Sequence, residues 1–300
     1  MKYAVIDIGS NTVRLNIYNQ DQEGRINPLL SKKHVAGLAS YVEDGCLTQK
    51  GIDKLVRILQ SFQLICQTFD IDKVIAFATA SLRYVANREE VIASVQPLTG
   101  LTIELVSGED EAWYGYQGIL HDYDIPEGFI VDIGGGSCEL TLIQDRDVVY
   151  AKSLPAGSLS LYKKFCSRLL PDPAEAKKIR KYVRGLLQES GLPLPDHRLP
   201  IYGVGGTLRA TGNLCQEYLG LASSQQITQE DIKILSKALL AEQSSAMKVL
   251  LQVSPERVHT ICPGILMLLS ILSYSGARKV LISDKGVREG ILVSKLMAGC

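Results

Sequence analysis

The sequence has no charge bias and no long apolar run. Lys plus Arg number 32 and Asp plus Glu also number 32, whereas a protein that coats nucleic acid usually carries an excess of basic residues. The longest apolar stretch, Ile261–Leu272, is about half as long as a membrane span, and it contains a proline and a glycine. We therefore expect a buried helix there, with no nucleic-acid partner and no membrane partner.

Cysteine and histidine also lack the spacing of a metal site. The 7 cysteines include no Cys-X-X-Cys pair, and none has a histidine partner at metal-ligand spacing. An odd number of cysteines scattered through apolar segments is typical of a reduced cytosolic protein. The N-terminal segment reaches the carboxylate of Asp7 too early to form the apolar part of a signal peptide. These features predict a cytoplasmic protein.

One local pattern occurs twice along the chain. The apolar strand Tyr3–Ile6 leads into the turn Asp7–Asn11, and Phe129–Val131 leads into Asp132–Ser137. The two copies lie too far apart for a solenoid repeat, and a chain of 300 residues is long enough for two domains. One α/β domain duplicated once accounts for the pattern.

Hydrophobic periodicity places helices and strands around these turns. The predicted helices cover 48–69, 87–95, 109–120, 174–189 and 287–297, and the predicted strands cover 13–17, 74–77, 101–106, 139–143, 148–153, 199–204 and 279–282. The polar segment 121–128 predicts the domain boundary, which gives domains at 1–123 and 124–300. Two placements stay open for the last helix, about 287–300: on the second domain, or folded back onto the first.

Turns of small residues follow buried strands in both halves. Glycine lets the backbone approach an anion, and successive N–H groups can then cradle phosphate oxygens. A third such turn, Gly203–Thr207, follows a predicted strand and begins a predicted helix, as at a helix N-terminus that binds anions. Any one of these is often only a tight turn, but together they predict a shared phosphate site. Its candidate residues are Ser10, Asn11, Gly134, Gly135, Gly136, Ser137, Gly205, Gly206 and Thr207.

Several segments, in order along nearly the whole chain, resemble one known family. They are Asp7–Leu15, Ala78–Arg83, Ser107–Ala112, Asp132–Leu140, Gly203–Thr207 and Gly286–Gly290. They are similar to the motifs of the exopolyphosphatase / guanosine pentaphosphate phosphatase family, in its short two-domain form. The resemblance implies the actin/Hsp70/acetate-kinase superfamily fold: two ribonuclease-H-like domains with an interdomain cleft.

The resemblance also implies an activity. The expected reaction is hydrolysis of the terminal phosphoanhydride of inorganic polyphosphate, or of guanosine pentaphosphate (pppGpp) to ppGpp, with Mg²⁺ as cofactor. A homodimer is compatible with the family. Glu111 matches the catalytic glutamate that activates water as a general base, the alternative being a plain surface glutamate. Arg83 matches a phosphate-binding arginine, the alternative being a surface or capping arginine.

Carboxylates at strand ends are the candidate metal ligands. Asp7 and Asp132 each end a buried strand, where an unpaired carboxylate would be costly. Mg²⁺ prefers one or two carboxylates plus phosphate oxygens, so we expect these residues around the ion. Glu139 either joins Asp132 there or faces solvent.

Three positions depart from the family pattern and keep other functions open. Cys138 stands where the family usually has Thr, and we interpret it as a packed small residue and not a nucleophile. Ser160 stands where Arg is common, and His259 where an acidic residue is more usual. The alternatives are a non-catalytic polyphosphate or alarmone binder, and a kinase of the same superfamily, which would need an adenine pocket and an acceptor site.

Overall fold

The computed structural model describes residues 1–23 and 25–297. The chain divides into two compact units, Met1–Ser107 and Gly108–Cys300. The boundary predicted from the sequence, after residue 123, lies beyond helix α4 (Gly108–Ile119), which belongs to the second unit. The predicted last helix is α11 (Val287–Met297); its expected final residues, 298–300, lie outside the described residues.

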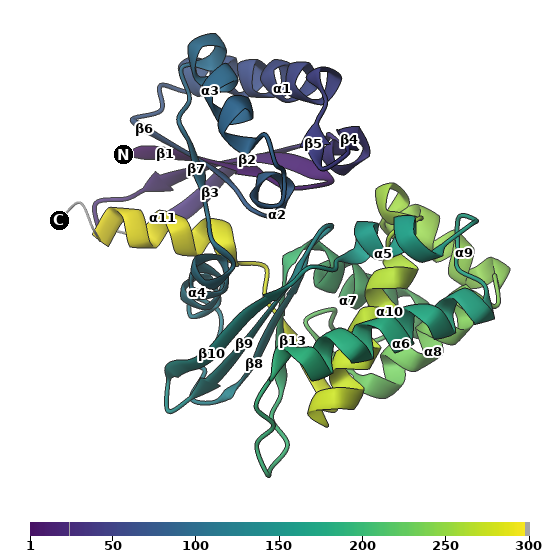
Figure 1. Ribbon diagram of the computed structural model, residues 1–300. Coiled ribbons are helices and arrows are strands. Elements are labelled where there is room, and N and C mark those ends of the chain that lie inside the picture. The colour runs from purple at the N-terminus through teal and green to yellow at the C-terminus, as the bar shows by residue number, and fades with distance from the viewer. Residues whose placement is uncertain (24, 298–300) are drawn as a thin grey trace. The chain divides into compact units, whose positions relative to one another are not determined.

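The first unit is built on one sheet in the order β3-β2-β1-β6-β7. β1 pairs antiparallel with β2 and parallel with β6. Helices α1 and α3 lie on one face of the sheet (Figure 1), and α1 buries Leu55, Leu59 and Phe62 in the core. The main elements are β1 (Lys2–Ile8), β2 (Thr12–Gln20), β3 (Ile26–Val35), α1 (Gln49–Thr68), β6 (Lys73–Ala78), α2 (Ala80–Arg83), α3 (Arg88–Thr99) and β7 (Ile103–Leu105).

The second unit repeats this sheet and adds a strand at the far edge, in the order β10-β9-β8-β11-β13-β12. β8 pairs antiparallel with β9 and parallel with β11, as β1 does with β2 and β6. The predicted duplication of one α/β domain is therefore confirmed. The strands are β8 (Gly128–Ile133), β9 (Cys138–Gln144), β10 (Asp147–Leu154), β11 (Ile201–Val204), β12 (Gln226–Thr228) and β13 (Lys279–Ile282).

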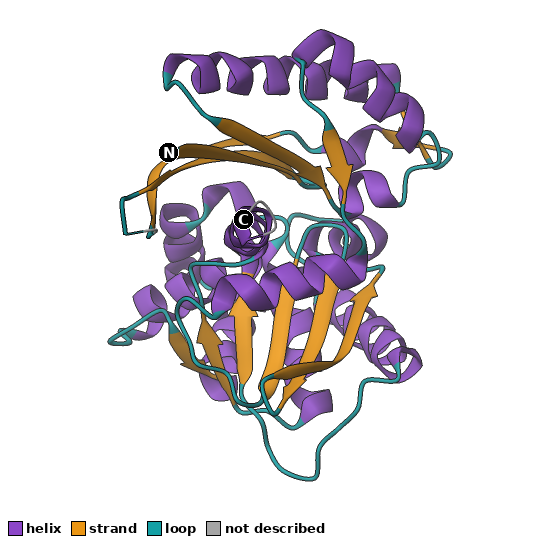
Figure 2. Cartoon of the chain, turned by 90° about the vertical axis from the view of Figure 1, so that its left-hand side faces the viewer, coloured by secondary structure: helices purple, strands orange, loops and turns teal. Residues whose placement is uncertain are grey.

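Helices cover both faces of the second sheet (Figure 2). Alternate residues of β8 point to opposite faces: Ile130 packs with Tyr116 and Ile119 of α4, while Val131 packs into a larger core on the other side. The helices of that larger core are α5 (Ser158–Phe165), α6 (Pro173–Ser190), α7 (Gly205–Leu219), α8 (Gln229–Leu240), α9 (Ser244–Val253) and α10 (Ile261–Ser275).

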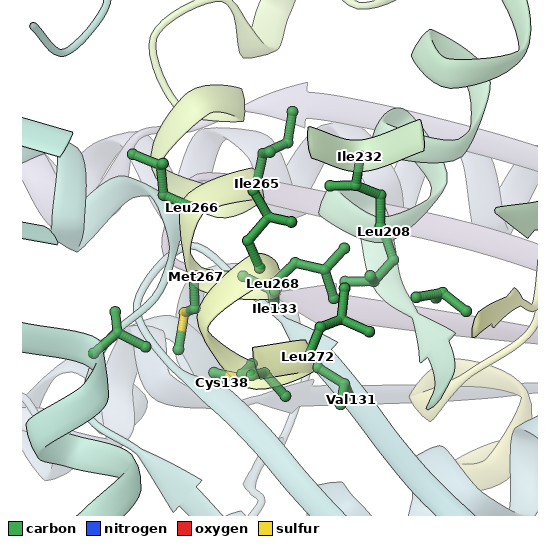
Figure 3. Close-up of a cluster of buried hydrophobic side chains, with 14 of the residues drawn as sticks. Val131, Ile133, Cys138, Leu208, Ile232, Ile265, Leu266, Met267, Leu268 and Leu272 are labelled. Atoms are coloured by element: carbon green, nitrogen blue, oxygen red, sulfur yellow. The ribbon is translucent and has the colours of Figure 1, made fainter. Parts of the chain in front are cut away.

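The longest apolar stretch of the sequence forms α10, the central helix of this core. Its side chains pack against Val131, Ile133 and Cys138 of the sheet and against Leu208 and Ile232 of neighbouring helices (Figure 3). The prediction of a buried helix is confirmed. Among the described residues, no helix is both long and apolar enough to cross a membrane.

Strand β3 did not emerge from the periodicity. It is an edge strand with most of its residues exposed, and it contains Pro28, Lys32 and Lys33. Proline and lysine are common on sheet edges because they discourage pairing with another chain. With little of either face buried, the strand has no apolar alternation for the sequence to reveal.

Candidate functional site

Two candidate carboxylates of the second unit are neighbours across a hairpin. Asp132 lies near the end of β8 and is paired in register with Glu139, near the start of β9. Residues directly opposite on antiparallel strands point to the same face. Glu139 is buried and accepts a hydrogen bond of 2.7 Å from Ser153 Oγ, which corrects the alternative of a solvent-facing sheet residue.

The glycine turn that joins β8 to β9 is held by the first turn of α5. Ser158 N and Oγ donate to Gly134 O at 2.9 and 3.1 Å, and the amides of Leu159 and Ser160 donate to Gly135 O, each at 3.0 Å. In a trans peptide the next N–H points opposite to the C=O. The N–H groups of Gly135 and Gly136 therefore point away from α5, as in a backbone cradle for an anion.

The turn between β11 and α7 lies beside the same carboxylate. Val204, the last residue of β11, pairs with Asp132, and Gly205 follows with φ +80°. A Cβ at residue 206 would lie 2.1 Å from Arg257 Nη2, so the Arg257 guanidinium lies directly over Gly206. The Asp132 carboxylate and the Arg257 guanidinium thus both lie at the N-terminus of α7, the positive end of the helix dipole, where anions are stabilised.

Thr207, the third candidate of this turn, is buried in the protein interior. A Cβ at Gly264 of α10 would lie 2.4 Å from Thr207 Cγ2. The Thr207 methyl group therefore packs against α10 and fixes the turn.

Two arginines beside Asp132 were not among the residues predicted from the sequence. Burial lowers the pKa of Arg257, and the charges of Glu256 and Asp132 oppose that shift. Burial and the charge of Arg288 lower the pKa of Arg209, against the charge of Asp132. Arginine stays protonated in proteins, so both remain cations. Arg209 follows the glycine turn closely enough to have been found from sequence, whereas Arg257 reaches it only through the tertiary fold.

Glu111 lies in the first turn of α4. It is 7% exposed, whereas its neighbours Glu109 and Asp110 are exposed. The alternative of a plain surface glutamate therefore does not hold for Glu111. A carboxylate at this end of a helix is stabilised by the helix dipole.

The first unit carries a hairpin of the same kind. Asp7 of β1 is paired in register with Arg14 of β2, so both side chains point to the same face. The turn is held in place because Ser10 O accepts from Ala39 N at 3.1 Å and Asn11 O accepts from Gly37 N at 2.8 Å. Arg14 therefore lies opposite a carboxylate, at the position that Glu139 occupies in the second unit.

Arg83 ends the short helix α2 behind strand β6. Its Nη1 donates to Val106 O at 3.1 Å, and its guanidinium lies 5.2 Å from the centre of the Tyr84 ring. The Ser81 hydroxyl donates to Ile8 O, which ties α2 to the end of β1. Within the first unit, the Asp7–Asn11 turn and the helix of Arg83 thus follow two neighbouring parallel strands, β1 and β6.

Asp132 and Glu139 are compatible with a magnesium ion whose other ligands are phosphate oxygens and water. Among the described residues, no group of three or more His, Cys, Asp or Glu is placed to hold a metal ion. Asp132 and Glu139 nevertheless form a cross-strand pair, and Mg²⁺ typically takes one or two carboxylates plus phosphate oxygens and water. Two carboxylates are therefore suitable ligands for an ion that binds together with a phosphate.

Two of the residues that depart from the family pattern, Cys138 and His259, differ in what surrounds them. Cys138 is buried, and burial, followed by the charges of Glu139 and Asp132, raises the pKa of its thiol well above the usual value. Such a thiol stays protonated and is inert as a nucleophile. The His259 ring contacts the Tyr162 ring edge-on, with 5.2 Å between centres.

Comparison with known proteins identifies relatives over the whole chain. The chain is 27% identical over 305 aligned positions to exopolyphosphatase 1 of Mycobacterium bovis, covering 99% of this chain and 88% of that protein. It matches the crystal structure of the Aquifex aeolicus member of the Ppx/GppA family with a TM-score of 0.80 and 28% identity, covering 100% of this chain and 98% of that one.

A further structure, an exopolyphosphatase from Cytophaga hutchinsonii, has a TM-score of 0.84 at 20% identity over 99% of this chain and 98% of the other, and it supports the fold alone. The sequence of this chain matches the Ppx/GppA phosphatase family over residues 17–298. With the duplicated sheets, the paired carboxylates and the glycine turns, this match leads to one conclusion: the chain belongs to the Ppx/GppA phosphatase family.

Proposed function

We propose that this chain is an exopolyphosphatase that hydrolyses the terminal phosphoanhydride bond of inorganic polyphosphate. One observation carries the proposal: the two glycine turns of the second unit lie on either side of Asp132, with Arg257 directly over Gly206. Backbone N–H groups and arginine forks are the groups that bind phosphate oxygens. The name of the mycobacterial relative points to the same substrate.

The two turns and the arginine bind and orient the terminal phosphate. The N–H groups of Gly135 and Gly136, and those at the start of α7, donate hydrogen bonds to its oxygens, and Arg257 adds positive charge. In phosphoryl transfer, positioning and charge stabilisation provide most of the rate. The proposal also gives Arg83 and the Ser10–Asn11 turn of the first unit a phosphate-binding role, as the resemblance implies.

Glu111 moves the proton. The oxygen of a water molecule attacks the terminal phosphorus, and the bond from phosphorus to the bridging oxygen breaks. Glu111 takes the proton that the water loses, as a general base, and the bridging oxygen leaves with the shortened chain. Asp132 and Glu139 would hold Mg²⁺, and the bound ion would neutralise phosphate charge. For Asp7 of the first unit, a metal-binding role is what the resemblance implies.

The experiment is phosphate release from polyphosphate of defined length and from pppGpp, with and without Mg²⁺, by wild type and Glu111→Gln. Turnover that requires Mg²⁺ and falls by about a hundredfold or more in the variant supports the hydrolase. The relative rates rank polyphosphate against pppGpp, whose 5′-terminal phosphate is held by the same kind of bond.

The second candidate is a binder of polyphosphate or alarmone without turnover. Cys138, Ser160 and His259, which depart from the family pattern, favour it. Binding of polyphosphate without phosphate release by wild type would establish it. Consumption of ATP that depends on an added acceptor, without free phosphate, would instead indicate a kinase.

A further inference from the structure

Helices α4 and α11 of the second unit touch backbone to backbone. A Cβ at Gly290 of α11 would lie 1.8 Å from Tyr114 O, and a Cβ at Gly118 of α4 would lie 2.0 Å from Gly286 O. Real Cβ atoms do not approach backbone atoms so closely, so neither position accepts a side chain unless a helix moves. Figure 1 shows α11 lying across α4.

The loop before α11 fixes the other end of α4. Asp122, just past α4, accepts a hydrogen bond of 2.6 Å from Ser283 Oγ and lies 3.3 Å from Lys285 Nζ. The Tyr123 hydroxyl donates to Ile282 O at 3.1 Å. Ser283 is 1% exposed, whereas the ion pair between Asp122 and Lys285 is partly open to solvent.

The same loop also holds the helix of the second phosphate turn. Arg209 of α7 donates from Nη1 to Ser283 O and to Asp284 O, both at 3.3 Å. Arg209 lies in the turn of α7 that begins with the glycines beside Asp132. The segment Ser283–Gly290 therefore joins two elements of the candidate site: α4, which carries Glu111, and α7, which carries the phosphate turn.

We propose that Gly290 is a positioning residue for hydrolysis. Because it has no side chain, α11 can pack directly against the backbone of α4, and this contact holds Glu111 at a fixed place relative to the turn that starts α7. The inference depends on the proposed role of Glu111 as the base. Tyr114 is about one helical turn from Glu111, so a displacement at Tyr114 reaches the carboxylate almost undiminished. A misplacement of about 1 Å can cost roughly a hundredfold in rate.

The test compares glycine-to-alanine substitutions at different positions of the interface between α4 and α11. Gly290→Ala and Gly118→Ala should each lower kcat for phosphate release from polyphosphate by about tenfold to a hundredfold, with KM within about threefold of wild type. Gly115→Ala is the matched control, because its Cβ would lie 3.9 Å from Val287 Cγ2 in ordinary contact, and it should keep wild-type kcat. A wild-type kcat for Gly290→Ala, or an equal loss in Gly115→Ala, overturns the inference.

A second comparison asks whether the effect acts through Glu111. In the Glu111→Gln background, Gly290→Ala should cause no further loss of the residual kcat, because the group that it positions is already gone. Losses that multiply would overturn the inference. A failure of the proposed function is seen separately, as wild-type turnover by Glu111→Gln alone.

If Gly290→Ala does not fold, a variant that adds no atoms can test the same inference. Ser283→Ala removes the hydroxyl that donates to Asp122 and accepts from Lys285 N, without adding an atom. It should lower kcat by about threefold to tenfold, with no effect in the Glu111→Gln background. A lower thermal midpoint with unchanged kcat well below the transition would show a merely structural role and overturn the inference.

Discussion

The carboxylate of Asp132 lies directly over the α-carbon of Gly205: a Cβ at residue 205 would be 2.0 Å from Asp132 Oδ1. Gly205 also has φ +80°, a conformation that costs about 1 kcal/mol or more with any side chain. Position 205 therefore requires glycine for two separate reasons: its backbone conformation, and the close approach of Asp132, a candidate metal ligand.

Gly205→Ala should lower both stability and activity. The strain should lower the free energy of unfolding by about 1–2 kcal/mol, and the displaced Asp132 should lower phosphate release by about a hundredfold. Denaturant melts and initial rates measure the two effects. Gly220→Ala is the control, because Gly220 has φ +69° with no described atom within 4 Å of an added Cβ. It should lose stability alone; equal loss of activity in both variants would contradict this explanation.

Arg257→Lys should weaken phosphate binding although the charge is kept. The guanidinium lies over Gly206 with Nη2 nearest to it; a guanidinium can present two parallel donors, whereas an ammonium presents a point charge. We expect KM for polyphosphate to rise about tenfold or more, as measured by initial rates at several substrate concentrations. Arg278→Lys, at an exposed position of the same unit, should match wild type. An unchanged KM for Arg257→Lys would remove Arg257 from the site.

Cys138→Ala should keep phosphate release close to wild type. The raised pKa keeps the thiol protonated, and its role is to pack in the core beside α10 (Figure 3). The small loss of volume should cost about 1 kcal/mol of unfolding free energy. Rates and melts of the purified variant measure both. Abolished turnover in a folded variant would instead indicate a covalent step at Cys138.

His259 should make the protein less stable in mild acid. Burial, and then the charge of Arg257, holds its pKa below the ordinary value of 6.5. A group with a depressed pKa binds its proton more tightly in the unfolded chain, so its stabilising effect is present above the unfolded pKa and is lost as the pH falls below it. Between about pH 7.5 and pH 5.5, His259→Gln should therefore lose less stability than wild type in denaturant melts. Equal losses would show that His259 is not the responsible group.

Much of the fold followed from local patterns. The two strand–Asp–Ile–Gly turns predicted the duplication, because the same buried strand followed by the same kind of turn occurs once in each half of the chain. The same patterns brought Asp132, Glu139 and both glycine turns to neighbouring strands. Strand β3 escaped detection because its side chains are mostly exposed and leave no apolar alternation.

What the sequence did not reveal depends on contacts between distant segments. Arg257 lies over Gly206 only because the segment before α10 passes beside the start of α7. The motif Gly286–Gly290 resembled the family, but its physical reason, two helices in backbone contact, appears only when α4 and α11 are placed together. Likewise, the burial of Glu111 next to exposed Glu109 and Asp110 depends on tertiary packing.

The most direct test of the central claim is the fate of oxygen during phosphate release in water enriched in heavy oxygen. If water attacks the terminal phosphorus of polyphosphate, the released phosphate gains one heavy oxygen per turnover, the shortened chain gains none, and Glu111→Gln slows the incorporation and the release together. Label in the shortened chain, or phosphate released without label, would contradict terminal hydrolysis by water.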